Sequence, residues 1–175
     1  MNSLLPTTRR QREIFNTVSH LLCTLLAIAA LVTLVTAGIE SGSTRKIVAF
    51  SVYGGSLVFL YMSSTLYHWL WGRAKMFFKR MDYIGIFMLI AGTYTPFALL
   101  TIGGTWGWGV LAVIWSVALF GGVVYAIRGD RAKKLAFVLY IAMGWIGLVT
   151  AGPMSRNLPP AALTLLVGGG LLYTI

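Results

Sequence analysis

Three side chains that could do chemistry together lie within one stretch of the sequence: Ser64, His68 and Asp82. Ser64 and His68 are four residues apart, so on a helix they lie on the same face. Asp82 follows a short basic turn and opens the next apolar segment. Ionisable groups at the margins of membrane spans are costly to bury, and they point to a functional site in which they have partners. We expect these three groups to be one another's partners.

A histidine held by a neighbouring hydroxyl and lying close to a carboxylate suggests a metal site or a proton relay. Catalytic zinc usually takes three protein ligands and acidifies a water molecule at its open position. The chain has only two histidines, His20 and His68, and one cysteine. His20, His68 and Asp82 could supply three ligands, and hydrogen bonding within a packed bundle is the alternative interpretation. From the residues alone the metal site is incomplete.

The segments that must position these residues are apolar and long. The 175 residues are 58% hydrophobic and 10% charged, which a soluble domain of this size would not tolerate on its surface. We therefore predict an all-α integral membrane protein. A helix needs about 20 residues to cross the hydrocarbon core. Six apolar stretches are candidates, at about Val18–Ile39, Ile47–Trp71, Tyr83–Ile102, Trp106–Ile127, Leu135–Gly152 and Pro160–Ile175.

No linker divides the chain, and we expect an amphipathic N-terminal segment at residues 1–17 followed by a polytopic transmembrane domain at 18–175. Glu13, Asn16 and His20 recur at spacings of three and four, which makes one polar stripe on a helix. A helix lying at the membrane interface explains such a stripe. In the functional alternative, His20 faces the bundle. The last apolar stretch is short and ends without a polar flank, so we expect the sequence to lack its true C-terminus.

The net charge of +10 is distributed unevenly along the chain. Eleven of the fourteen lysines and arginines lie in the N-terminal segment and in the second and fourth loops between spans. The positive-inside rule therefore predicts that these segments are cytoplasmic. This orientation brings His20, His68 and Asp82 to a similar depth near the cytoplasmic face. The basic residues set topology and contact anionic lipid head groups, and we expect no nucleic-acid partner.

Two further features indicate helix packing. Gly54 and Gly55 in the second span are small enough to allow close approach of another helix. Pro96 near the outer end of the third span predicts a kink or a helix end, because proline lacks the backbone donor. Thr93 and Thr95 beside it can satisfy freed carbonyl groups with their hydroxyls.

Six ordered motifs of the chain resemble the bacterial hemolysin III family, within the larger progestin and adiponectin receptor superfamily. The resemblance runs from about residue 13 to the end of the sequence. The motifs are Glu13-x-x-Asn16-x-x-Ser19-His20, Ser51-Val52-Tyr53-Gly54-Gly55-Ser56, Ser64-Thr65-Leu66-Tyr67-His68, Met81-Asp82-Tyr83-Ile84-Gly85-Ile86, Ala91-Gly92-Thr93-Tyr94-Thr95-Pro96-Phe97 and Met143-Gly144-Trp145.

The resemblance implies a seven-helix transmembrane bundle with a cytoplasmic N-terminus, of which this sequence carries about six helices. It also implies a zinc ion near the cytoplasmic side, held by the histidine of a Ser-x-x-x-His motif and by a His-x-x-x-His pair on the seventh helix. By motif, His68 is the first zinc ligand, Ser64 a nearby polar group and Asp82 a carboxylate linked to the metal through water. His20 receives no metal role, and the His-x-x-x-His pair is absent from this sequence.

The function implied by the resemblance is zinc-dependent hydrolysis of a lipid amide or ester, with Asp82 and Ser64 as catalytic residues. One alternative is a cytolysin whose copies form a homo-oligomer and permeabilise a membrane. Another is a non-enzymatic sensor of membrane lipid state with a structural metal. All three imply a multi-pass protein of the bacterial inner (plasma) membrane with lipids as partners.

Overall fold

The computed structural model describes residues 4–150, 152 and 159–174, and this described part contains helices and no strand. The prediction of an all-α protein is therefore confirmed. The elements in chain order are α1 (Leu4–Glu40), α2 (Thr44–Trp69), α3 (Gly72–Pro96), the π-helix η1 (Phe97–Ile102), α4 (Gly104–Arg128), the 3₁₀ turn η2 (Gly129–Ala132), α5 (Lys133–Val149) and α7 (Pro160–Thr174).

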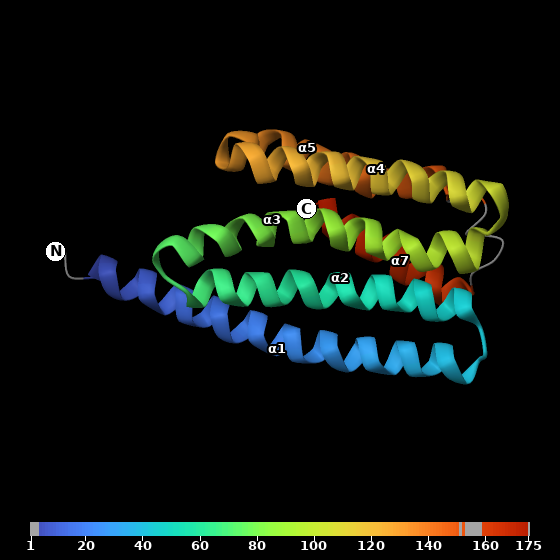
Figure 1. Cartoon of the computed structure of the whole chain (residues 1–175), viewed down its shortest axis with the longest axis horizontal. Coiled ribbons are helices and arrows are strands. Elements are labelled where there is room, and N and C mark those ends of the chain that lie inside the picture. The colour runs from blue at the N-terminus through green and yellow to red at the C-terminus, as the bar shows by residue number, and fades with distance from the viewer. Residues whose placement is uncertain (1–3, 151, 153–158, 175) are drawn as a thin grey trace.

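The first four long helices run up and down in a row, and each packs on the next one in sequence (Figure 1). α5 turns back beside α4 and also packs on α3, while α7 contacts α5. In this arrangement the start of α1, the α2–α3 turn and the α4–α5 turn all lie at one end of the bundle (Figure 1). We call this end the basic end, because the N-terminal, second-loop and fourth-loop cations of the sequence belong to it.

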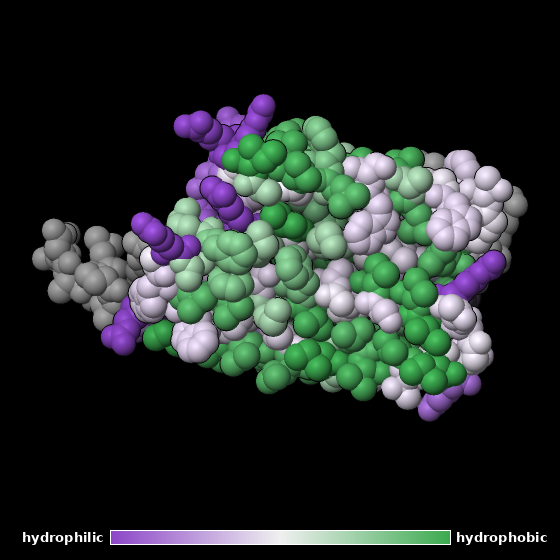
Figure 2. All heavy atoms as spheres, in the orientation of Figure 1, coloured by the Kyte–Doolittle hydropathy of each residue, from purple (hydrophilic) through white to green (hydrophobic). Residues whose placement is uncertain are grey.

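Four helical runs in the described part are long and apolar enough to cross a membrane: Arg10–Glu40, Thr44–Trp69, Gly72–Ile102 and Gly104–Gly147. The last run has 44 residues and consists of α4 and α5, which fold back on each other at η2. Figure 2 shows apolar side chains over most of the visible length of the bundle and hydrophilic ones towards its ends. The chain is a multi-pass membrane protein, and the count of six helices stays a prediction.

The core lies between α3, α4 and α5. Phe87, Ile114, Tyr125 and Met143 are at most 1% exposed. The ring of Phe87 packs so closely on Gly121 that a β-carbon at this glycine would collide with it. Small residues let helix backbones approach in this way, which matters in lipid because dispersion contacts hold the helices together there.

Two tyrosines join α3 to α5 by hydrogen bonds to the backbone. The Tyr94 hydroxyl of α3 donates to the carbonyl of Met143 at 2.9 Å, and the Tyr140 hydroxyl of α5 donates to the carbonyl of Tyr83 at 2.7 Å. A hydroxyl inside an apolar bundle needs such a partner, because leaving it unpaired there is costly. The pair fixes the register of α5 against α3.

The helix change predicted at Pro96 is present. α3 ends at this residue, and the chain continues as the π-helix η1 rather than as α-helix. The hydroxyls of Thr93 and Thr95 donate to the carbonyls four residues before them, at 2.8 and 3.0 Å. The threonines therefore bond to the carbonyls of Leu89 and Ala91 and not to that of Gly92, the carbonyl four residues before the proline.

Candidate functional site

The polar residues singled out in the sequence meet towards the basic end of the bundle. The rings of His20 on α1 and His68 on α2 are stacked, with centroids 5.5 Å apart and an interplanar angle of 4°. Ser64 on α2 lies near the carboxylate of Asp82 on α3, and this carboxylate lies within electrostatic reach of both histidines. Three helices thus bring His20, His68 and Asp82 to the same depth, as the predicted topology required.

The partner of His68 is a residue that the sequence analysis had not paired with it. Glu13 Oε2 lies 2.8 Å from His68 Nδ1, and Glu13 Oε1 accepts a hydrogen bond from Lys75 Nζ at 3.1 Å. His68 Nδ1 is thus held by a carboxylate of α1, while Ser64 lies near Asp82. A signal for Glu13 did exist: it begins the polar stripe that His20 ends, and the chain has only four acidic residues.

The Glu13 contact restricts the chemistry available to the imidazole. A carboxylate at Nδ1 favours the tautomer with the proton on that nitrogen, which leaves the lone pair on Nε2. Metal-bound histidines almost always have their second ring nitrogen held in this way by a carboxylate or carbonyl. The side chains of His68 and Glu13 are 15% and 26% exposed, so the pair lies partly out of water. His68 is therefore oriented as a zinc ligand or a proton acceptor would be.

The described residues do not complete a metal site. No group of three or more His, Cys, Asp or Glu side chains in this part of the chain is close enough to hold a metal ion. In the described residues the ligand set His20, His68 and Asp82 left open by the sequence is thus not formed: the two histidine rings stack face to face, and Glu13 holds Nδ1 of His68. His68 suits zinc in its donor atom and its orientation. The described residues, however, bring too few ligands together to hold the ion.

Further contacts fix the surroundings of the cluster. Thr24 on α1 and Thr65 on α2 share a hydrogen bond of 3.2 Å between their hydroxyls, and both side chains are buried. Lys75 Nζ lies 4.9 Å from the centre of the Tyr67 ring, so a cation–π contact adds to its bond with Glu13. These contacts hold α1, α2 and the start of α3 in one arrangement around His68.

Comparison with known proteins places the chain in a family. A family model described as "Haemolysin-III related" matches residues 8–175. Hemolysin-3 of Bacillus cereus is 39% identical over 167 residues, which cover 94% of this chain and 76% of that protein. A Hemolysin-3 homolog of Bacillus subtilis (strain 168) is 39% identical over 167 residues, covering 94% and 78%. No solved structure matches. The chain belongs to the haemolysin-III related family of membrane proteins.

Proposed function

We propose that the protein is a membrane hydrolase that acts on a lipid amide or ester, with its reaction centre at His68 and Asp82. The observation that carries this proposal is the 2.8 Å contact between Glu13 and His68, near the Asp82 carboxylate, among apolar helices. A general base must be held within hydrogen-bond reach of the proton that it takes, and the Glu13 contact holds His68 in one orientation. The position within the bundle suits a substrate that enters from the bilayer.

Each residue of the centre has a role of its own. Glu13 fixes the ring of His68 through Nδ1 and leaves the lone pair on Nε2. In this proposal the Ser64 hydroxyl donates to the Asp82 carboxylate and holds it in place. Asp82 is then the group that accepts a proton from the attacking water. Lys75 keeps the Glu13 carboxylate in position through the 3.1 Å bond.

Zinc is the cofactor in this proposal, with His68 as the ligand that the described residues provide. When bound, zinc supplies a Lewis acid that polarises the substrate carbonyl. In the part of the chain that the structure describes, no second and third His, Cys, Asp or Glu side chain joins His68 in a group that could hold the ion.

The proposed location is the bacterial plasma membrane with the N-terminus in the cytoplasm. The basic residues of the N-terminal segment and of the α2–α3 and α4–α5 turns support this orientation, because cytoplasmic ends of spans carry the excess of lysine and arginine. The candidate centre would then lie near the cytoplasmic leaflet.

The test is hydrolysis by the purified chain in lipid vesicles with added zinc. Fluorescent ceramide and fatty-acid ester substrates report the release of fatty acid. We expect His68→Ala and Asp82→Asn to lower turnover by about a hundredfold or more, as for loss of an acid–base group. Glu40→Gln removes a carboxylate at the opposite end of α1 and should leave turnover unchanged. Equal turnover in all four proteins would contradict the proposal.

Membrane permeabilisation is a second candidate, which the name of the Bacillus cereus relative favours. In this alternative, copies of the chain would associate in a target membrane and cause leakage. Dye release from vesicles that carry the purified protein separates the two candidates. Leakage that persists in His68→Ala, without fatty-acid release, would favour permeabilisation over hydrolysis.

A further inference from the structure

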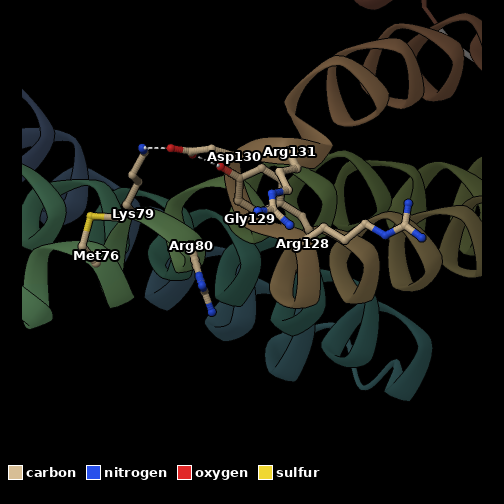
Figure 3. Close-up of a pocket in the computed structure, with 8 residues that line it drawn as sticks. Met76, Lys79, Arg80, Arg128, Gly129, Asp130 and Arg131 are labelled. Atoms are coloured by element: carbon tan, nitrogen blue, oxygen red, sulfur yellow. Dashed lines mark hydrogen bonds and ion pairs between the residues drawn. The ribbon is translucent and has the colours of Figure 1, made fainter.

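A second polar region at the basic end is separate from the His68 cluster. It is a cavity of about 210 Å³ between the start of α3 and the α4–α5 turn (Figure 3). Four cations and one carboxylate line it, together with one methionine, one tyrosine and one glycine. The lining residues are Met76, Lys79, Arg80, Tyr125, Arg128, Gly129, Asp130 and Arg131.

The one carboxylate of this cavity is already neutralised. Asp130 accepts hydrogen bonds from Lys79 at 2.7 Å and from the Tyr125 hydroxyl at 3.4 Å, and it lies 3.4 Å from Lys133 Nζ. Figure 3 shows the Lys79 and Asp130 side chains pointing at each other, with Arg131 at the turn beside Gly129 and the Arg128 side chain extending away from this pair. The remaining arginines therefore give the cavity its excess positive charge.

The arginines of the cavity lack an acidic partner of their own. In the part of the chain that the structure describes, no carboxylate forms an ion pair with Arg80, Arg128 or Arg131. Arg80 donates to the carbonyl of Ala126 at 3.3 Å, which offsets the partial negative charge at the end of α4. Among the described residues no carboxylate pairs with Arg128 or Arg131, and both side chains are exposed, so their guanidinium groups can turn to a ligand. Guanidinium groups suit phosphate because they offer paired donors in one plane.

The shape of the cavity depends on one glycine. Gly129 has a φ of +54°, a conformation that side-chain-bearing residues rarely adopt, and it ends α4. The Arg80 guanidinium lies beside it, because a β-carbon built at Gly129 would lie 3.8 Å from Arg80 Nε and Nη2. The sharp turn thus brings Arg128 and Arg131, on either side of this glycine, to the same cavity as Arg80.

Apolar side chains adjoin the cations. A neighbouring cavity of about 500 Å³ shares Met76 and Arg80 with the first one and is also lined by Phe77. Met76 and Phe77 are 54% and 56% exposed. A free phosphate ion would need no apolar wall, whereas a phospholipid at the end of a transmembrane bundle needs cations for its head group and apolar contacts for its chains.

We propose that this cavity binds the phosphate of an anionic glycerophospholipid, with Arg128 and Arg131 as the main ligands and Met76 and Phe77 beside the acyl chains. The lipid bridges α3 and the α4–α5 turn and stabilises their contact. This site is independent of the proposed hydrolysis at His68.

The test is binding of labelled phosphatidylglycerol and phosphatidylcholine to the purified chain in detergent. We expect the wild type to prefer phosphatidylglycerol. Arg128→Gln combined with Arg131→Gln should weaken phosphatidylglycerol binding by about tenfold or more, since each cation near an anionic lipid contributes substantially. The matched control, Arg12→Gln with Lys134→Gln, removes the same charge at the same end outside the cavity and should change binding less than about twofold.

Three results would overturn the proposal. The first is equal binding of the two lipids by the wild type. The second is an equal loss of binding in the control pair, which would mean that the general charge of the basic end attracts lipid. The third is saturable binding of inorganic phosphate that displaces phosphatidylglycerol, which would mean a free-phosphate site. Helical circular dichroism of each variant checks folding, and Arg128→Lys with Arg131→Lys, which keeps the charge, should retain part of the binding.

Discussion

Glu13 is bonded to two side chains from other helices, and this gives a single residue of α1 influence over the whole candidate site. Its two carboxylate oxygens are divided between His68 on α2 and Lys75 on α3. Hydrogen bonds that involve a charged group contribute about 1.5–3 kcal/mol, and partial exposure of the three side chains lowers this value through solvent screening. The stability of the α1–α2–α3 contact should therefore depend measurably on this carboxylate.

We predict that Glu13→Gln lowers the free energy of unfolding by about 1 kcal/mol and that Glu13→Ala lowers it more, because alanine leaves both partners without an acceptor. Thermal unfolding of the purified protein in mild detergent measures the change. Glu40→Gln is the control, since Glu40 is exposed at the other end of the same helix. Unchanged unfolding in both Glu13 variants would mean that this carboxylate does not hold the helices together.

At the scale of helices, the closest approach of α1 to α2 depends on one of two adjacent glycines. A β-carbon at Gly54 would lie 2.6 Å from Leu31 Cδ1 and 3.0 Å from Leu31 Cα, whereas one at Gly55 would meet nothing within 4 Å. The sequence suggested packing for both glycines, and the structure shows it for Gly54. The His20–His68 stack needs α1 and α2 to stay this close.

We predict that Gly54→Ala destabilises the protein by about 1–3 kcal/mol, because the added methyl group forces the backbones of α1 and α2 apart. Gly55→Ala should leave stability unchanged or raise it by up to about 1 kcal/mol, since alanine favours the helix. Both variants carry the same glycine-to-alanine substitution, at adjacent positions of α2. Unfolding in detergent measures both, and equal effects would show that the Leu31 contact is unimportant.

At the scale of the whole molecule, the charge distribution and the order of the helices both indicate the same orientation of the protein in the membrane. The up-and-down order brings the N-terminal segment, the α2–α3 turn and the α4–α5 turn to the same end, where most of the cations lie. The α1–α2 turn at the other end has only Arg45 and Lys46 next to it. The proposed lipid cavity and the proposed hydrolytic centre therefore face the same leaflet.

We predict that a cysteine at Arg45 reacts with a membrane-impermeant maleimide added to intact bacterial cells and that one at Lys134 does not, in a Cys23→Ser background. Both positions are exposed in the bundle, so only the membrane distinguishes them. After the cells are opened, both cysteines should react. Labelling at Lys134 and not at Arg45 in intact cells would reverse the proposed orientation.

Much of the fold follows from the sequence, because its causes are local. Long apolar runs predict membrane helices, since in lipid the backbone must satisfy its own hydrogen bonds. The change of helix type at Pro96 follows from the missing donor of proline. The similar depth of His20, His68 and Asp82 follows from the alternation of spans, which requires no knowledge of which helix faces which.

The partners within the site and the lipid cavity depend on the tertiary structure. Depth alone does not say that Glu13 holds His68, because this contact depends on the rotation of each helix about its axis. The cavity of Arg80, Arg128 and Arg131 combines the start of α3 with the turn after α4, which are about 50 residues apart in the sequence. The rotation and packing of each helix depend on many weak contacts with several other helices. A pattern along the sequence does not show these contacts between helices.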